Sequence, residues 1–316
     1  MTTTQPLRLG TRGSDLALAQ AREVRRRLAE AHAELRDEAA VEIIVIKTTG
    51  DRVQDRTLAE IGGKGLFTKE IEEALVEERI DAAVHSMKDV PTWLPDGLII
   101  DAILPREDPR DAFFSRGGES LAELPAGAVV GTASLRRQAQ VLLHRPDLRV
   151  VPLRGNVPTR LRKLSDGEVD ATLLALAGLK RLGLDDRITG LMAPEEMLPA
   201  VAQGAIGLEV RADDSLTRER IAPLNDLPSA RRVTAERACL AVLDGSCRTP
   251  IASLAELEDD ENTLYLRGLV VMPDGTQAQS AEARGAATDA EAIGREIGGQ
   301  LRAAAGPDFF AALEHL

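Results

Sequence analysis

The chain has 316 residues, a net charge of −12 and only 2% aromatic residues. This length allows two or three domains with cores of their own. A nucleic-acid binder usually needs a basic face or stacking rings, and the composition argues against both. No run approaches the ~18 apolar residues of a membrane span, and the first residues do not have the pattern of a secretory signal. The two cysteines, Cys239 and Cys247, imply no disulfide framework, so we expect a soluble cytoplasmic protein.

The first two-thirds of the chain alternates short apolar runs with amphipathic stretches, a pattern typical of a parallel α/β sheet. The run at residues 169–174 echoes the run at 80–84, which favours two similar lobes joined near residues 104–109. We expect further strands near residues 7–9, 41–46, 129–130 and 150–153, and helices over residues 16–28, 66–78, 135–144 and after residue 156.

After about residue 223 the pattern changes to a helix, alternating apolar runs around a Pro273-Asp274-Gly275 turn, and a last helix. The sequence therefore predicts two α/β lobes with mostly parallel sheets and a small α+β C-terminal domain. The predicted domains are residues 1–104 with a return segment 203–222, residues 108–199, and residues 226–316.

The segment from His85 to Pro91 brings a histidine, Lys88 and Asp89 to the end of an expected buried strand. In open α/β sheets, ligands bind at the carboxyl ends of the strands. Taken alone, the segment fits a solvated loop with a local ion pair about as well as it fits a catalytic site.

Four loops combine arginine with hydroxyl or glycine residues where a strand gives way to a helix. Ser14 and Ser134 could simply cap those helices. Arg136 and Arg137 are harder to explain, because cations in a first helical turn oppose the helix dipole by about 0.3–1 kcal/mol each. An anionic ligand would offset that cost, so we favour a cleft that binds several carboxylates. The four loops are Thr11-Arg12-Gly13-Ser14, Thr132 to Arg137, Arg154-Gly155-Asn156 and Thr159-Arg160.

The glycines around Lys64 do not form a phosphate-binding P-loop, because glycine follows the lysine where Ser or Thr is required. Nucleotide binding is therefore disfavoured. We interpret residues 51–63 as a lid over the site.

Cys247 follows Asp244-Gly245-Ser246, a strong turn sequence that would hold its thiol out on a loop. An inert core cysteine is the better interpretation for Cys239. No cluster of further ligands favours a metal at Cys247, and no histidine is a clear base for a thiol nucleophile. Cys247 fits best as a point of covalent attachment.

Together these residues resemble the hydroxymethylbilane synthase, or porphobilinogen deaminase, family. The resemblance covers residues 7 to about 250. This chain departs from the family pattern at Pro158, Ala202 and Ser246. The matching motifs are Thr11-Arg12-Gly13-Ser14, Gly62 to Phe67, His85 to Pro91, Ser134 to Gln138, Leu153 to Val157 and the loop around Cys247.

The resemblance implies two lobes like those of periplasmic binding proteins and a third domain carrying a dipyrromethane cofactor on a thioether to Cys247. It implies a transferase of tetrapyrrole (haem) biosynthesis that joins four porphobilinogen molecules head to tail with loss of ammonia and then hydrolyses the chain free. The cofactor is built from the same substrate. The implied protein is a cytoplasmic monomer that binds no metal, nucleic acid or membrane and passes its product to uroporphyrinogen-III synthase.

The resemblance also assigns site residues. Asp89 is the expected catalytic residue, since a carboxylate stabilises a cation that develops when ammonia leaves. Lys88 would either keep Asp89 ionised or hold a cofactor carboxylate. The expected cofactor-binding residues are Cys247, Lys88, Thr132, Ser134, Arg136, Arg137, Arg154 and Gln203. The expected substrate-binding residues are Arg12, Ser14, Lys64, Phe67, Ser86, Arg160 and Arg181.

Two alternative functions stay open at this point. A two-lobed carboxylate sensor would explain the arginine loops but not Cys247 or the third domain. A thiol-dependent transferase with a free Cys247 would need a basic partner. The mass of the purified chain, bare or carrying two pyrrole units, separates these alternatives.

Overall fold

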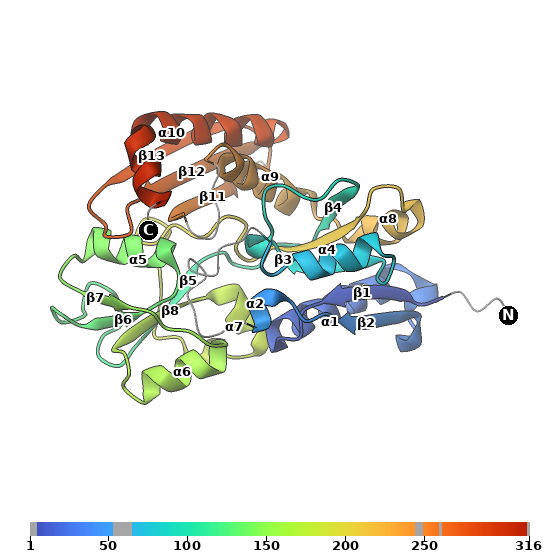
Figure 1. Cartoon of the computed structure of the whole chain (residues 1–316), viewed down its shortest axis with the longest axis horizontal. Coiled ribbons are helices and arrows are strands. Elements are labelled where there is room, and N and C mark those ends of the chain that lie inside the picture. The colour runs from blue at the N-terminus through green and yellow to red at the C-terminus, as the bar shows by residue number, and fades with distance from the viewer. Residues whose placement is uncertain (1–4, 53–64, 244–248, 259–260, 315–316) are drawn as a thin grey trace. The chain divides into compact units, whose positions relative to one another are not determined.

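The computed structural model describes residues 5–52, 65–243, 249–258 and 261–314 (Figure 1). The described residues fall into two compact units. The first comprises those up to residue 107 together with residues 205–230, and the second comprises residues 108–204 and those from residue 231 onward. No helix in the described part of the chain has the length and apolar composition needed to span a bilayer.

The first unit is built on a five-stranded sheet in the order β2-β1-β3-β10-β4. β1 pairs in parallel with both β2 and β3, whereas β10 pairs antiparallel with β3 and β4. β10 comes from the return segment that the sequence predicts for this lobe. The strands are β1 (Leu7–Thr11), β2 (Val41–Val45), β3 (Ala82–Ser86), β4 (Leu98–Ile103) and β10 (Ile206–Arg211).

Helices cover both faces of this sheet. On one face, Leu7 and Leu9 pack with Val24 and Leu28 of α1. On the other, Ile71 and Leu75 of α4 pack with Ile80 and Ala83. α4 begins at Lys69, three residues later than the expected helix. The helices of this unit are α1 (Asp15–Ala31), α2 (Thr49–Arg52), α4 (Lys69–Val76) and α8 (Ser215–Ile221), and a short 3-10 helix, η3, covers Met87–Asp89.

The second unit contains a five-stranded sheet of the same plan, in the order β7-β6-β8-β5-β9. β6 pairs in parallel with β7 and β8, and β5 pairs antiparallel with β8 and β9. The weak sequence echo between the two lobes therefore reflects a repeated sheet topology. The elements are β5 (Asp111–Ser115), β6 (Val129–Gly131), α5 (Leu135–His144), β7 (Arg149–Val151), α6 (Val157–Ser165), β8 (Ala171–Ala175), α7 (Leu176–Leu182) and β9 (Gly190–Leu191).

The same unit carries a three-stranded antiparallel sheet, β11-β12-β13, with α10 packed along it (Figure 1). Gly306, with φ of 77°, and Pro307 bend α10 near its end. These elements confirm the fold class, two α/β lobes and a small α+β domain, while the three domain boundaries stay a prediction. The elements are α9 (Leu227–Val242), β11 (Ile251–Leu257), β12 (Thr263–Val271), β13 (Ala278–Ala286) and α10 (Ala290–Glu314).

Candidate active site

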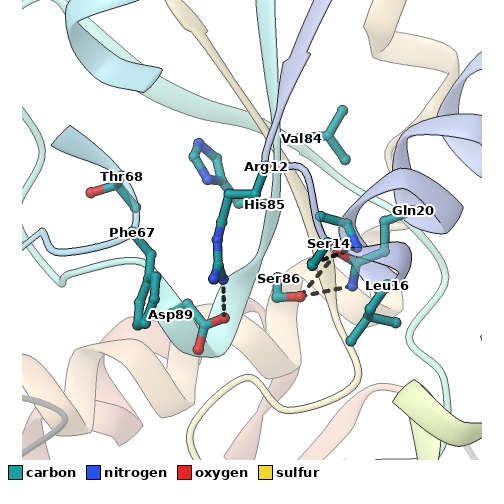
Figure 2. Close-up of a pocket in the computed structure, with 11 residues that line it drawn as sticks. Arg12, Ser14, Leu16, Gln20, Phe67, Thr68, Val84, His85, Ser86 and Asp89 are labelled. Atoms are coloured by element: carbon teal, nitrogen blue, oxygen red, sulfur yellow. Dashed lines mark hydrogen bonds and ion pairs between the residues drawn. The ribbon is translucent and has the colours of Figure 1, made fainter. Parts of the chain in front are cut away.

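A pocket opens in the first unit where β1 and β3 end (Figure 2). This is the carboxyl end of two parallel strands, the position at which open α/β sheets bind ligands. Among its lining residues are Arg12, Ser14, Gln20, Phe67, His85, Ser86 and Asp89. Five of the seven are residues that the resemblance assigns to the site.

Asp89 closes η3 directly after β3. Met87 is buried, and its backbone N–H donates to the Ala205 carbonyl at 3.0 Å. Val90 is also buried, and its N–H donates to the Met87 carbonyl. These anchors fix the turn, so the Asp89 carboxylate stays one-third exposed at the pocket. The Asp89 carboxylate therefore belongs to a short 3-10 turn that its buried neighbours hold in place.

Arg12 lies at the end of β1 and meets three partners. Its guanidinium carbon is 4.1 Å from the centre of the Phe67 ring, a cation–π contact. Its Nη1 is 3.9 Å from Asp89 Oδ2, and its Nε donates to Asp51 Oδ1 at 3.1 Å. Burial alone would raise the pKa of Asp51, but the Arg12 guanidinium holds it below its ordinary value. Arg12, an expected substrate-binding residue, is therefore already paired with carboxylates of the chain.

Two hydroxyls of the pocket have partners within the chain. Ser14 caps α1 and accepts from the Ala17 N–H at 3.3 Å, as the plainer interpretation predicts. Ser86 Oγ accepts from Gln20 Nε2 at 2.7 Å. Sequence reasoning missed Gln20, whose only signal is a polar residue on the buried face of an amphipathic helix. Lys88, beside Asp89, is half-buried.

His85 is not a loop residue, contrary to the expectation that it follows the strand. It lies within β3, and its Nε2 is 2.8 Å from Oε2 of Glu209 on β10. Both side chains are almost fully buried. Glu209 had no sequence signal, because the return segment that carries it lies far along the chain.

Arg136 and Arg137 begin α5 in the second unit, but a carboxylate of the chain already binds them. Arg136 Nη2 donates to Asp111 Oδ2 at 2.6 Å, and Arg137 Nη2 donates to Asp111 Oδ1 at 2.8 Å. All three side chains are buried. Burial alone would raise the pKa of Asp111, but the two guanidinium groups hold it far below its ordinary value. The cost of these charges at a helix start, for which the sequence argument invoked an anionic ligand, is therefore offset within the chain by Asp111.

Neighbouring polar groups complete this buried cluster. Gln203 Nε2 donates to Asp111 Oδ1 at 2.8 Å and to the Pro109 carbonyl at 2.7 Å. Ser134 caps α5, and its own N–H donates to Thr132 Oγ1. Ala202 has φ of 56°, a left-handed conformation that favours glycine, which explains the glycine of the family pattern there.

Arg154 and Arg160, in the same unit, have no carboxylate beside them among the described residues comparable to Asp111. Burial, and then the charges of Arg137 and Arg154, lower the pKa of Arg160 to about 10. Arg160 Nε donates to the Gly155 carbonyl at 2.8 Å. Among the described residues, neither Arg154 nor Arg160 forms an ion pair with a carboxylate. Like charges gathered without counter-charge favour an anionic ligand.

The remaining expected residues are placed as follows. Arg181 Nη2 donates to the Gly204 carbonyl at 2.7 Å. Pro158 lies in the first turn of α6, where proline is tolerated, so this departure from the family pattern leaves the helix intact. Cys239 is fully buried, and burial raises the pKa of its thiol to about 12, which confirms that it is a core residue.

Other predictions fall on residues that the structure does not describe. Lys64, Ser246 and Cys247 lie outside the described residues, as do all but the first two positions of the expected lid, residues 51–63. In the described ranges, no cluster of His, Cys, Asp or Glu could hold a metal ion.

Comparisons with known proteins agree with the sequence resemblance. A family model described as porphobilinogen deaminase, dipyromethane cofactor binding domain, matches residues 7–219, and one for the C-terminal domain matches residues 230–303. Porphobilinogen deaminase of Paracoccus denitrificans is 59% identical over 96% of each chain. The chloroplastic enzyme of Oryza sativa subsp. japonica is 55% identical over 98% of this chain and 86% of its own.

A solved periplasmic substrate-binding protein of an ABC transporter from Coxiella burnetii is 16% identical, with a TM-score of 0.41 over 69% of this chain and 91% of its own. The two family models cover the lobes and also the C-terminal domain, which a two-lobed carboxylate sensor would not explain. The chain belongs to the porphobilinogen deaminase family.

Proposed function

We propose that this chain carries out the reaction of its family at the pocket around Asp89. That reaction joins four porphobilinogen molecules head to tail on a dipyrromethane primer, releases ammonia at each step and ends with hydrolysis of the linear tetrapyrrole. The observation that supports this placement is the Asp89 carboxylate, held by η3 at the rim of a pocket that also contains Arg12 and Phe67.

Asp89 has two tasks in this proposal. When ammonia leaves the aminomethyl group of porphobilinogen, the positive charge is shared with the pyrrole nitrogen, and a fixed carboxylate stabilises that charge as it develops. When the new carbon–carbon bond has formed, the same carboxylate accepts the proton lost from the pyrrole α-carbon. Both tasks need a carboxylate in a fixed position, which the buried Met87 and Val90 on either side of it provide.

Arg12 is proposed to bind a carboxylate of porphobilinogen, which carries one acetate and one propionate. In the structure this guanidinium already meets Asp51 and Asp89. A substrate carboxylate must therefore replace Asp51 or share the guanidinium with it. Ser86 with Gln20, and Phe67, line the same pocket and are proposed to contact the pyrrole ring and its substituents.

The arginines of the second unit fit a dipyrromethane group, which brings four carboxylates. Arg154 and Arg160 offer positive charge without an ion pair in the described part of the chain, and Arg136 keeps a buried Nε without a described hydrogen-bond partner. We propose that these residues, with Arg137, hold the cofactor through its carboxylates, and that Cys247 attaches it. When bound, the cofactor supplies the pyrrole end to which the first porphobilinogen is added.

We also propose that the chain works in the cytoplasm as a monomer and passes its product to uroporphyrinogen-III synthase. This proposal rests on the family resemblance. Light scattering of the purified protein tests the monomer, and a coupled assay that compares transfer of product to the synthase with and without a trap for free product tests the hand-over.

The first prediction concerns Cys247. The chain purified after expression should weigh two pyrrole units more than its sequence, and Cys247→Ser should lack this excess mass and the activity. Cys239→Ser is the matched control, because Cys239 is buried with a pKa raised to about 12 and should keep both the mass and the activity. Active wild-type protein with the bare mass would contradict the attachment.

The second prediction separates the arginines by stage. Arg160→Leu removes a charge that no described carboxylate neutralises, so it should stabilise the free chain slightly while stalling elongation and accumulating enzyme-bound partial chains. Arg136→Leu leaves Asp111 with a single guanidinium and should yield mostly protein without cofactor. Native mass spectra measure both outcomes. Normal loading and normal release in both variants would contradict the proposed carboxylate binding.

A further inference from the structure

Arg12 is held in position by two neighbours in the first unit, and one of them, Asp51, has no role in the reaction described above. Asp51 Oδ1 accepts hydrogen bonds from both Nε, at 3.1 Å, and Nη2 of Arg12. The carboxylate therefore binds the side edge of the guanidinium, the edge that these two nitrogens form. The Phe67 ring lies against the same group, with its centre 4.1 Å from the guanidinium carbon. The position of the guanidinium is thus set from two directions.

The Asp51 carboxylate is itself oriented by Thr48. Thr48 is fully buried, and its hydroxyl donates to Asp51 Oδ2 at 2.8 Å. Its backbone N–H donates to the same oxygen at 3.4 Å. Between these two residues, the Gly50 N–H donates to the Leu66 carbonyl at 2.9 Å, which ties α2 to the segment that carries Phe67. Asp51 therefore binds Arg12 from a fixed position.

Gly50 gives the Phe67 ring the room that it needs beside Arg12. A Cβ on Gly50 would lie 2.2 Å from Cε1 of Phe67, closer than any real contact, so a larger residue would displace the ring. The adjacent residues Gly50 and Asp51 thus act on one guanidinium. One makes room for the ring against its face, and the other accepts hydrogen bonds from its edge.

The second edge of the guanidinium, formed by Nη1 and Nη2, is the one left for a ligand. Nη1 makes no hydrogen bond to any described residue, and its distance of 3.9 Å to Asp89 Oδ2 is beyond hydrogen-bond range. Figure 2 shows this end of Arg12 in the pocket, beside Phe67 and directed toward Asp89. Two parallel N–H groups on one edge of a guanidinium match the two oxygens of a carboxylate.

We propose that Asp51 is a positioning residue for the substrate. It holds Arg12 by the side edge, so that the other edge receives a carboxylate of porphobilinogen while the guanidinium stays out of hydrogen-bond range of Asp89. The substrate then shares Arg12 with Asp51 and does not replace it. Without Asp51, the guanidinium could close on Asp89 and neutralise the carboxylate that the reaction needs. This role rests on the proposed function, since it gives the bound carboxylate its source.

A change of KM in a single variant tests this role by its sign. Asp51→Asn removes a negative charge near an anionic substrate, so electrostatics alone would lower KM. The proposed role requires the opposite, because a guanidinium that is no longer held in place binds the substrate carboxylate less well. In the complete, cofactor-loaded enzyme we expect KM for porphobilinogen to rise roughly tenfold and kcat to fall by a smaller factor.

Two further variants accompany this one. Asp101→Asn is the control matched in charge, because Asp101 pairs with Arg218 in the same unit and neither residue lines the pocket. It should change neither constant. Thr48→Val keeps the shape of the side chain but removes the hydroxyl that orients Asp51, so it should raise KM by a smaller factor than Asp51→Asn. Intact mass and thermal unfolding first confirm that each variant is loaded and folded.

A double-mutant cycle shows whether Asp51 acts through Arg12. In the Arg12→Gln background, Asp51→Asn should change KM no further. Independent effects of the two substitutions would overturn the proposal, and so would an unchanged or lowered KM in Asp51→Asn alone. If Asp51→Asn does not fold or load, Thr48→Val decides, and an unchanged KM there overturns the proposal. Failure of the proposed function itself would be seen separately, as wild-type protein that consumes no porphobilinogen.

Discussion

Asp89→Asn is expected to lower turnover about a thousandfold while the chain keeps its fold and its cofactor. A carboxylate ~4 Å from a developing cation contributes on the order of 4 kcal/mol at an effective dielectric near 20. Each ~1.4 kcal/mol is a factor of ten in rate. Because Asp89 is one-third exposed and no core side chain is removed, the variant should unfold at nearly the wild-type temperature.

Single-turnover kinetics with cofactor-loaded protein measure this effect free of any change in loading. Asp89→Glu is the matched control, since it keeps the charge but moves the carboxylate by about one methylene. We expect it to retain part of the activity. Asp89→Asn at nearly the wild-type rate, with intact cofactor, would show that this carboxylate is only a surface group and that the proposed mechanism is wrong.

Arg12 bears on the interpretation of this experiment. Its Nη1 lies 3.9 Å from Asp89, and Asp51 holds the other side of the guanidinium. Asp89→Asn removes one of its two carboxylates, which should leave Arg12 more available to a substrate carboxylate. A lower kcat with an equal or lower KM is therefore the expected pattern, and it separates a loss of transition-state stabilisation from a loss of substrate binding.

The sequence predicted the two lobes well because their information is local. Hydrophobic periodicity and turn residues place most strands and helices within a few residues, and the motif His85 to Pro91 places Asp89 at a strand end. The structure starts α4 at Lys69, later than the apolar pattern predicts. Helix boundaries are hard to predict from sequence, because they depend on capping and tertiary contacts more than on the apolar pattern.

The partners of the site residues could not be predicted, because they come from distant parts of the chain. Asp111 lies 25 residues before Arg136, and Glu209 lies 124 residues after His85. Glu209 meets His85 through the pairing of β10 with β3, and Asp111 of β5 meets Arg136 of helix α5 only once the second unit has folded. As long as Asp111 is not recognised as their partner, two adjacent arginines at a helix start indicate an external anion. With Asp111 present, part of that charge is neutralised within the chain, so we expect a bound anion to depend more on Arg154 and Arg160.

Asp111→Asn is therefore expected to destabilise the chain strongly. The carboxylate is fully buried and accepts from Arg136, Arg137 and Gln203. Breaking a buried charge pair by removing one partner costs about 3–5 kcal/mol, because uncompensated charge stays in the interior. For a chain of this size each kcal/mol shifts the unfolding temperature by about 2–4 °C, so protein without cofactor should unfold roughly 6–20 °C lower.

The pH dependence follows from the lowered pKa of Asp111. A carboxyl with a folded-state pKa below its ordinary value contributes stability that is fully present above the unfolded value, near 3.9, and is lost as the pH falls through the folded value. The difference in unfolding temperature between wild type and Asp111→Asn should thus stay constant from about pH 8 to pH 5 and narrow below about pH 4. Glu291→Gln, at the exposed pair with Arg295, is the control and should change little at any pH.

Comparing the cofactor-loaded and unloaded forms gives a second test of this prediction. If the cofactor carboxylates bind Arg136 and Arg137, they supply part of the negative charge that Asp111→Asn removes, so the loaded variant should be less destabilised than the unloaded one. Thermal unfolding of both forms, each checked by intact mass, measures the difference. An equal loss in the two forms would mean that Asp111 alone neutralises these arginines and that the cofactor is held by Arg154 and Arg160 instead.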